Sequence, residues 1–133
     1  MGERVQVGPL IYNVLEAEWK NEIGQKTPTQ RFLLLRVTIT NSGGREARPP
    51  LLTLVHSSGS EHTELSEVEG VHDWLGLLRR LEPAATEDGR IVFDVARGAS
   101  KLRLSDGGEP GQENTALVEI PLQLETPGPT PER

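Results

Sequence analysis

Apolar side chains recur at every second position along most of this chain, which is the spacing of a β-strand with one buried face. Four β-branched residues in succession, at positions 37–40, disfavour a helix there. The turn-forming residues at 41–44 then end this run. We predict a central strand that is apolar on both faces at its start and on one face at its end. The residues that share its main apolar parity are Leu33, Leu35, Val37 and Ile39.

Further short segments repeat this alternation and are separated by glycine, proline and asparagine. In one of them the alternation shifts by one residue at Leu15, which is the sequence pattern of a β-bulge. About seven or eight short strands with such turns predict an all-β, antiparallel β-sandwich, with an open barrel as the alternative. A doubly wound parallel sheet is excluded because no crossover helices separate the strands. The segments lie near residues 5–7, 10–19, 51–56, 62–65, 91–95, 102–104 and 118–124.

One segment, near residues 71–80, departs from this rhythm. The spacing of its apolar residues suits a short helix with Asp73 as the N-terminal cap. Gly76 weakens that interpretation, and an alternating pattern fits part of the segment as well. We expect a short helical or irregular segment, and the sequence leaves the conformation of residues 66–81 open.

The length of 133 residues suits a single domain with one core. The chain has no cysteine, so disulfides, thiolate nucleophiles and zinc–thiolate sites are excluded. We assign residues 1–125 to the sandwich and the proline-rich residues 126–133 to a disordered tail.

The formal charge of −6 gives the protein a surface that repels phosphate backbones and anionic lipid headgroups. Because the basic residues are also scattered, we do not expect nucleic acid as a partner. No apolar stretch approaches the ~20 residues that span a bilayer, so we expect no direct membrane insertion of this domain. The chain begins almost inside its first strand-like segment, and we therefore expect the native protein to carry a targeting segment upstream.

Two polar stretches are weak candidates for metal binding. The stretch HSSGSEH could place His56 and His62 opposite each other across a hairpin turn, but it lacks the ligand spacing of a zinc site. The acidic loop 106–114 includes Asp106 and Glu109, whose oxygens calcium could use, although the alternation of an EF-hand loop is missing. A polar hairpin and a flexible acidic loop are the simpler interpretations.

The chain offers no set of catalytic residues. The serines of HSSGSEH lack the G-x-S-x-G elbow of a nucleophile, and no base and orienting group stand at suitable spacing. The glycines at 107–108 lack the Lys-Ser/Thr that a phosphate-binding loop requires. We therefore expect no enzymatic activity and no cofactor.

The two tryptophans lead to different expectations. Trp19 follows the register of its strand-like segment, so we expect it in the core or at the edge of the core. Trp74 stands near Leu75 and Leu77, and these three are the candidate partner-binding residues, because aromatic anchors with aliphatic neighbours are typical of binding surfaces. Alternatively, this segment simply closes one end of the sandwich.

Three motifs run through residues 5–124. The pattern V-G-x-x-x-Y-x-V is matched by Val7, Gly8, Tyr12 and Val14. A strand motif that ends in N-x-G is matched by Phe32, Val37, Ile39, Asn41 and Gly43. A third motif, which begins with L-x-P and ends in F-D/E-V, is matched by Leu81, Pro83, Gly89, Val92, Phe93, Asp94 and Val95.

In these motifs the chain resembles a bacterial family of small immunoglobulin-like domains of unknown function. Members are commonly secreted or lipid-anchored, and the fold is similar to that of the secreted mycobacterial immunoprotective antigen. The chain departs from the family at Ala84 and Ala85, where Gly-Glu is usual, and at VHSSGSEH, where many members have an acidic turn. The resemblance implies an immunoglobulin-like β-sandwich in an extracytoplasmic location, either secreted or anchored to the envelope, and it implies no catalytic residues.

Together these observations predict a non-enzymatic, extracytoplasmic immunoglobulin-like module that binds an unknown protein partner or has a structural role. The alternative is a sensor domain that binds a small ligand or a metal through the 56–62 hairpin or the 106–114 loop.

Overall fold

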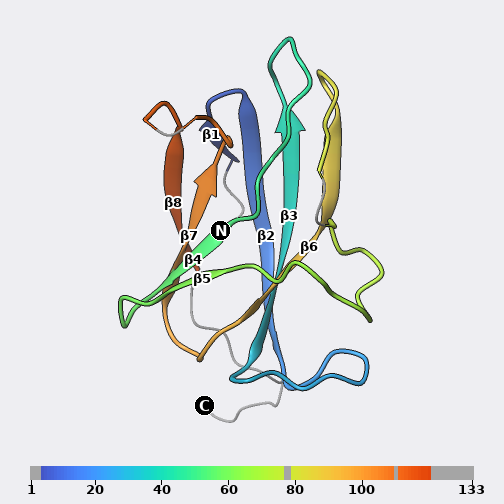
Figure 1. The fold of residues 1–133 in the computed structure, drawn as a ribbon, viewed down its shortest axis with the longest axis vertical. Coiled ribbons are helices and arrows are strands. Elements are labelled where there is room, and N and C mark those ends of the chain that lie inside the picture. Colours follow the sequence, from blue (N-terminus) through green and yellow to red (C-terminus); the bar gives the residue numbers. More distant parts are fainter. Residues whose placement is uncertain (1–3, 77–78, 110, 121–133) are drawn as a thin grey trace.

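The structure is a computed structural model, and it describes residues 4–76, 79–109 and 111–120. Its strands form two four-stranded antiparallel sheets, with the orders β1-β2-β3-β6 and β5-β4-β7-β8, which lie against each other (Figure 1). The predicted β-sandwich is therefore confirmed, and this part of the chain contains no helix. The strands are β1 (Arg4–Val7), β2 (Leu10–Lys20), β3 (Phe32–Asn41), β4 (Thr53–His56), β5 (Glu61–Thr63), β6 (Thr86–Asp94), β7 (Ser100–Ser105) and β8 (Thr115–Ile120).

The main core lies between the two sheets and is almost entirely apolar. One polar group crosses it: the Tyr12 hydroxyl donates a hydrogen bond to the Ser105 carbonyl oxygen (2.7 Å) and so joins β2 to β7. Burial raises the pKa of Tyr12 well above its ordinary value, so the hydroxyl keeps the proton that it donates. The largest fully buried apolar side chains in this core are Phe93, Leu10, Leu33, Leu35, Ile39, Leu52, Leu54, Ile91, Leu102 and Leu104.

The shift at Leu15 is a β-bulge, as the sequence predicted. The pairing of β2 with β3 changes register between Val14 and Glu16, and Leu15 is 39% exposed. Because the bulge adds one residue, Ala17 and Trp19 point back into the core, where both are buried. The expected core position of Trp19 is thereby confirmed.

A second, smaller apolar cluster lies on the other face of β3. It forms because the loop that follows β5 folds back over the start of β3 and over the end of β6. This cluster explains why the first residues of β3 are apolar on both faces. Its buried members are Ile23, Phe32, Leu34 and Val92, and Leu65, Val68 and Val71 pack against them.

Two glycines allow the loops around this second cluster to meet. Gly70 has a φ of +91°, and a Cβ atom there would lie 3.0 Å from the backbone nitrogen of Gly24. Residues of ordinary size would hold the two loops apart at this point. The β2–β3 loop and the β5–β6 connection therefore pack as one unit.

The strand predicted over 51–56 is shorter than expected, since β4 begins at Thr53. The Leu52 N–H donates to the Glu64 carboxylate (2.7 Å) rather than to a neighbouring strand, which the alternation of side chains could not show. The predicted tail at 126–133, together with its boundary at residue 125, lies outside the described residues.

Residues 71–76 form the irregular segment that the sequence allowed, and not the helix. Trp74 pairs with Arg90 of β6 in an isolated parallel bridge, so backbone groups that a helix would use are bound to a strand. Gly76 has a φ of +88°, far from the helical value. This segment places Trp74 and its neighbours beside β6.

Candidate binding site

A buried ion pair fixes the long connection between β5 and β6. The guanidinium group of Arg79 binds both carboxylate oxygens of Glu64, at 2.5 and 2.9 Å, and the two side chains are 3% and 0% exposed. Arg79 also donates to the carbonyl oxygens of Gly76 (3.0 Å) and Pro50 (3.2 Å). Charge-assisted, bidentate bonds of this kind are strong, and they hold the connection in one place at the end of the sandwich.

The segment from Asp73 to Leu75 lies along the edge of β6. The Arg90 N–H donates to the Asp73 carbonyl oxygen (2.8 Å), and the Arg90 carbonyl oxygen accepts from the Leu75 N–H (3.0 Å). The side chains of Arg90 and Asp73 also form an ion pair. Gly89 makes this approach possible, because a Cβ atom there would lie 2.5 Å from the Asp73 carbonyl oxygen and 2.7 Å from Leu75 Cδ2.

A cavity of about 250 Å³ lies between this segment and the end of the sandwich. Ligand pockets usually measure about 300–1,000 Å³, so this cavity suits one side chain or a small molecule rather than a large cofactor. Its apolar lining comes from three separate parts of the chain, and charged residues complete the wall. The lining residues are Ile39, Pro49, Leu75 and Leu81, with Arg79, Arg80 and Glu87.

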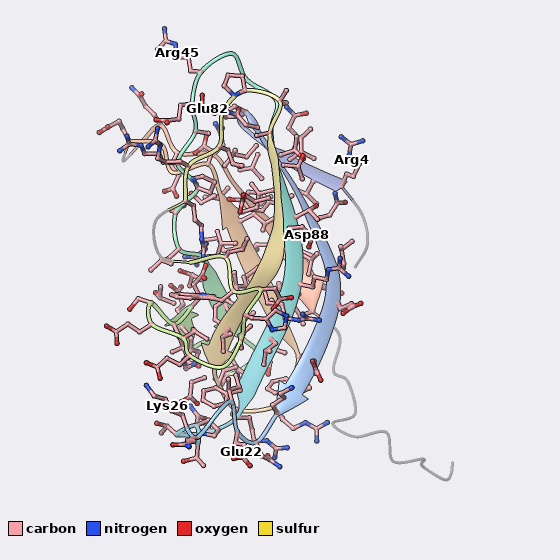
Figure 2. The ribbon with its side chains drawn as sticks, turned by 90° about the vertical axis from the view of Figure 1, so that its right-hand side faces the viewer. Arg4, Glu22, Lys26, Arg45, Glu82 and Asp88 are labelled. Carbon is pink, nitrogen blue, oxygen red and sulfur yellow. The ribbon has the colours of Figure 1, made fainter. Side chains whose placement is uncertain are left out.

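The charges around the cavity are only partly neutralised. The Arg80 Nε donates to Glu46 Oε2 (2.7 Å), and this hydrogen bond lowers the pKa of Glu46. On the outer face of the same sheet, Arg36 donates two hydrogen bonds to Asp88, at 3.0 and 3.2 Å, which lower the pKa of Asp88. Asp88, which Figure 2 labels, lies near the start of β6. Glu87 is exposed and has no ion-pair partner in the described part of the chain. Its negative charge is therefore not neutralised by any described side chain.

Of the three predicted partner-binding residues, the structure places one at the cavity. Leu75 lines the cavity. Trp74 is half-buried at the edge of β6, and its indole Nε1 is buried without a hydrogen-bond partner among the described residues. Leu77 lies outside the described residues. Arg80 and Glu87, which sequence reasoning did not find, come from different segments, and no local pattern connects them.

The hairpin from His56 to His62 joins β4 to β5, and its polar side chains bind one another. His56 Nδ1 lies 2.9 Å from Ser58 Oγ, and Ser58 Oγ lies 3.1 Å from Ser60 Oγ. Ser60 Oγ in turn lies 3.0 Å from His62 Nε2. Within the described ranges no three His, Asp or Glu side chains gather to hold a metal ion. These side-chain hydrogen bonds stabilise the hairpin turn.

The acidic loop is also closed by its own side chains. Asp106 accepts hydrogen bonds from the N–H groups of Gly108 (3.0 Å) and Asn114 (3.1 Å) and from Asn114 Nδ2 (2.8 Å). Burial acts to raise the pKa of Asp106, but these hydrogen bonds outweigh it, and the net shift is downward. Glu109 is exposed in the same loop. The Asp106 carboxylate therefore already accepts hydrogen bonds from within its own loop.

These features define a small all-β domain. The chain belongs to the family described as domain of unknown function (DUF4352), whose model matches residues 1–115. Family membership confirms the resemblance found in the three sequence motifs. Among curated proteins, no sequence matches the chain.

Solved structures show the same fold at low sequence identity. The yjhA protein of Bacillus subtilis has a TM-score of 0.68 and 15% identity, over 91% of this chain and 98% of yjhA. A presumptive lipoprotein of the same organism, ycdA, has a TM-score of 0.68 and 12% identity, over 87% of this chain but 38% of ycdA. The secreted protein MPT63 of Mycobacterium tuberculosis has a TM-score of 0.56 and 14% identity, over 84% of this chain and 82% of MPT63. The chain thus spans well under half of ycdA.

In the part of the chain that the structure describes, no helix has the length and apolar character needed to cross a membrane.

Proposed function

We propose that this domain is a non-enzymatic, extracytoplasmic β-sandwich module that binds a protein partner at the cavity beside Leu75. The location is supported by two proteins of the same fold, one a presumptive lipoprotein and the other secreted. The absence of catalysis is supported by the described lining of the cavity, which includes no serine, threonine, lysine or histidine to act as a nucleophile.

The single observation that carries this proposal is the cavity of about 250 Å³ with an apolar lining and a charged border. Buried Ile39 and Leu81 supply apolar surface, and half-buried Leu75 adds to the apolar lining. A hollow of this size accepts one apolar side chain of a partner, and burying such a side chain stabilises a complex by about 1.5–3 kcal/mol. Binding surfaces commonly depend on a few anchors of this kind.

A random dodecapeptide library displayed on phage and panned on the purified domain tests the proposal. We expect enriched peptides that share an apolar residue and whose affinity falls at least about tenfold in Leu75→Lys. Leu117→Lys is the matched control, because Leu117 is 57% exposed on β8, in the other sheet. Circular dichroism and urea unfolding check that both variants are folded.

The proposal is wrong if no peptide is enriched, or if binding survives Leu75→Lys, or if Leu117→Lys weakens it as much. The compartment is tested separately by protease treatment of intact cells that express the native gene. An extracytoplasmic domain is digested under these conditions, whereas a cytoplasmic marker protein is not.

A further inference from the structure

We propose that the partner binds as an extended strand that adds to the free part of the β6 edge, placing an apolar side chain in the cavity and a Lys or Arg side chain beside Glu87. This inference rests on the proposed function and specifies the chemistry of the partner. It is carried by three features of the described residues: the pattern of edge hydrogen bonds, the facing of the side chains and the unneutralised charge.

The first feature is the edge of β6. β6 is the last strand of its sheet and pairs with β3 on one side only (Figure 1). On the other side, the backbone groups of Arg90 bind the segment from Asp73 to Leu75, and the Val92 carbonyl oxygen accepts from the Leu65 N–H (2.8 Å). These positions of the edge are therefore protected.

Two residues earlier, no backbone group among the described residues protects the edge. Backbone groups in a strand alternate between the two sides, so the N–H and C=O of Asp88 point the same way as those of Arg90. In the described part of the chain, no backbone group binds them. The chain that covers Arg90 turns away at once, since the Trp74 N–H bonds to the Val71 carbonyl oxygen (3.2 Å). Among the described residues, the unpaired edge extends from Asp88 back to Thr86, the first residue of β6.

The second feature is the direction of the side chains. Glu87 pairs with Ile39 across the β3–β6 ladder, and both of these residues line the cavity. A residue added to the sheet opposite Glu87 has its side chain on the same face, because facing residues of neighbouring strands share a side. That side chain enters the cavity. Strand addition of this kind takes its affinity from backbone hydrogen bonds and its specificity from pockets for alternate side chains.

The third feature is charge. Glu87 is exposed and unpaired among the described residues, whereas the nearby cation Arg80 is bound to Glu46. The protein as a whole carries a formal charge of −6. A segment with Lys or Arg within two residues of its apolar anchor is therefore favoured over an acidic one, which both the local and the overall charge repel.

Peptides enriched from the library, synthesised with free amides, are the probe for this mode of binding. We expect the amide hydrogen exchange of Asp88, followed by NMR in the full domain, to slow at least about tenfold in the complex. Methylation of the peptide nitrogens that face β6 should lower the affinity at least about tenfold. Methylation of nitrogens on the opposite side of the peptide is the matched control and should change little.

Charge exchange tests the basic residue. Glu87→Lys should weaken a Lys-containing peptide at least about tenfold, and replacing that Lys by Glu in the peptide should restore binding to the variant. Glu22→Lys is the control, since Glu22 is an exposed carboxylate in the β2–β3 loop, at the end of the molecule away from Glu82 (Figure 2).

Two outcomes separate this inference from the proposed function. If peptides bind and depend on Leu75 but leave the exchange of Asp88 unchanged, strand addition is wrong and the binding module stands. If no peptide is enriched, both fail. If enriched peptides carry acidic residues and resist Glu87→Lys, the basic requirement is refuted.

Discussion

Removing one partner of the Glu64–Arg79 pair should destabilise the domain more than almost any other single change of a charged residue. In Arg79→Met, the fully buried Glu64 carboxylate loses two of its three donors and keeps only the Leu52 N–H at 2.7 Å. The carbonyl oxygens of Gly76 and Pro50 lose a donor as well. Breaking a buried ion pair in this way costs about 3–5 kcal/mol, out of a total stability of about 5–15 kcal/mol for a domain.

Urea unfolding followed by tryptophan fluorescence measures this loss directly. For a domain of this size, a loss of about 3–5 kcal/mol lowers the melting temperature by roughly 10–20 °C. The double variant Glu64→Leu/Arg79→Met removes both charges, so we expect a loss smaller than the sum of the two single losses by about 2–3 kcal/mol. The exposed Arg36–Asp88 pair provides the control, and Arg36→Met should change stability far less.

The reasoning is refuted if Arg79→Met costs less than about 1 kcal/mol, as an exposed pair would. Strict additivity of the two single losses would also refute it, because independent residues would then account for the effect.

Two further predictions concern a loop contact and an acid-sensitive loop. Gly70→Ala should cost about 1–3 kcal/mol in urea unfolding, and more than Gly59→Ala, since both have positive φ but only Gly70 touches another loop. If the two losses are equal, the contact with Gly24 contributes nothing. Because the pKa of Asp106 is lowered in the folded state, its stabilising effect is present above the ordinary value of 3.8 and is lost as the pH falls below it. Asp106→Asn should therefore weaken the dependence of the melting temperature on pH between about pH 5 and about pH 2. If the melting temperature of the variant falls with acid as steeply as that of the original protein, the prediction is wrong.

The sandwich itself follows from the sequence because the alternation of side chains is a local property. The parity of Leu33 and Ile39 identifies the face of β3 that points into the core. The same reasoning located the bulge at Leu15, where one extra residue reverses the parity. Such patterns need no knowledge of which strands pair.

The cavity and its charges could not be predicted in this way. Glu64 and Arg79 stand fifteen residues apart, in a connection without periodic pattern, and only the folded chain brings them together. The irregular path of residues 71–76 depends on the edge of β6, which is distant in sequence. The binding surface at Trp74 and Leu75 was predicted from residue types alone, and for that reason Arg80 and Glu87, which line the cavity with Leu75, were missed.

The contact between Gly24 and Gly70 has a consequence for how members of this family can vary. Each loop is held in position by its contact with the other. An insertion in one loop must therefore be matched by a change in the other, because otherwise the loops would separate and expose Phe32 and Leu34. The turn at Gly59 has no such partner within 4 Å. Related chains should therefore differ in length at that hairpin, while the lengths of the two joined loops change together.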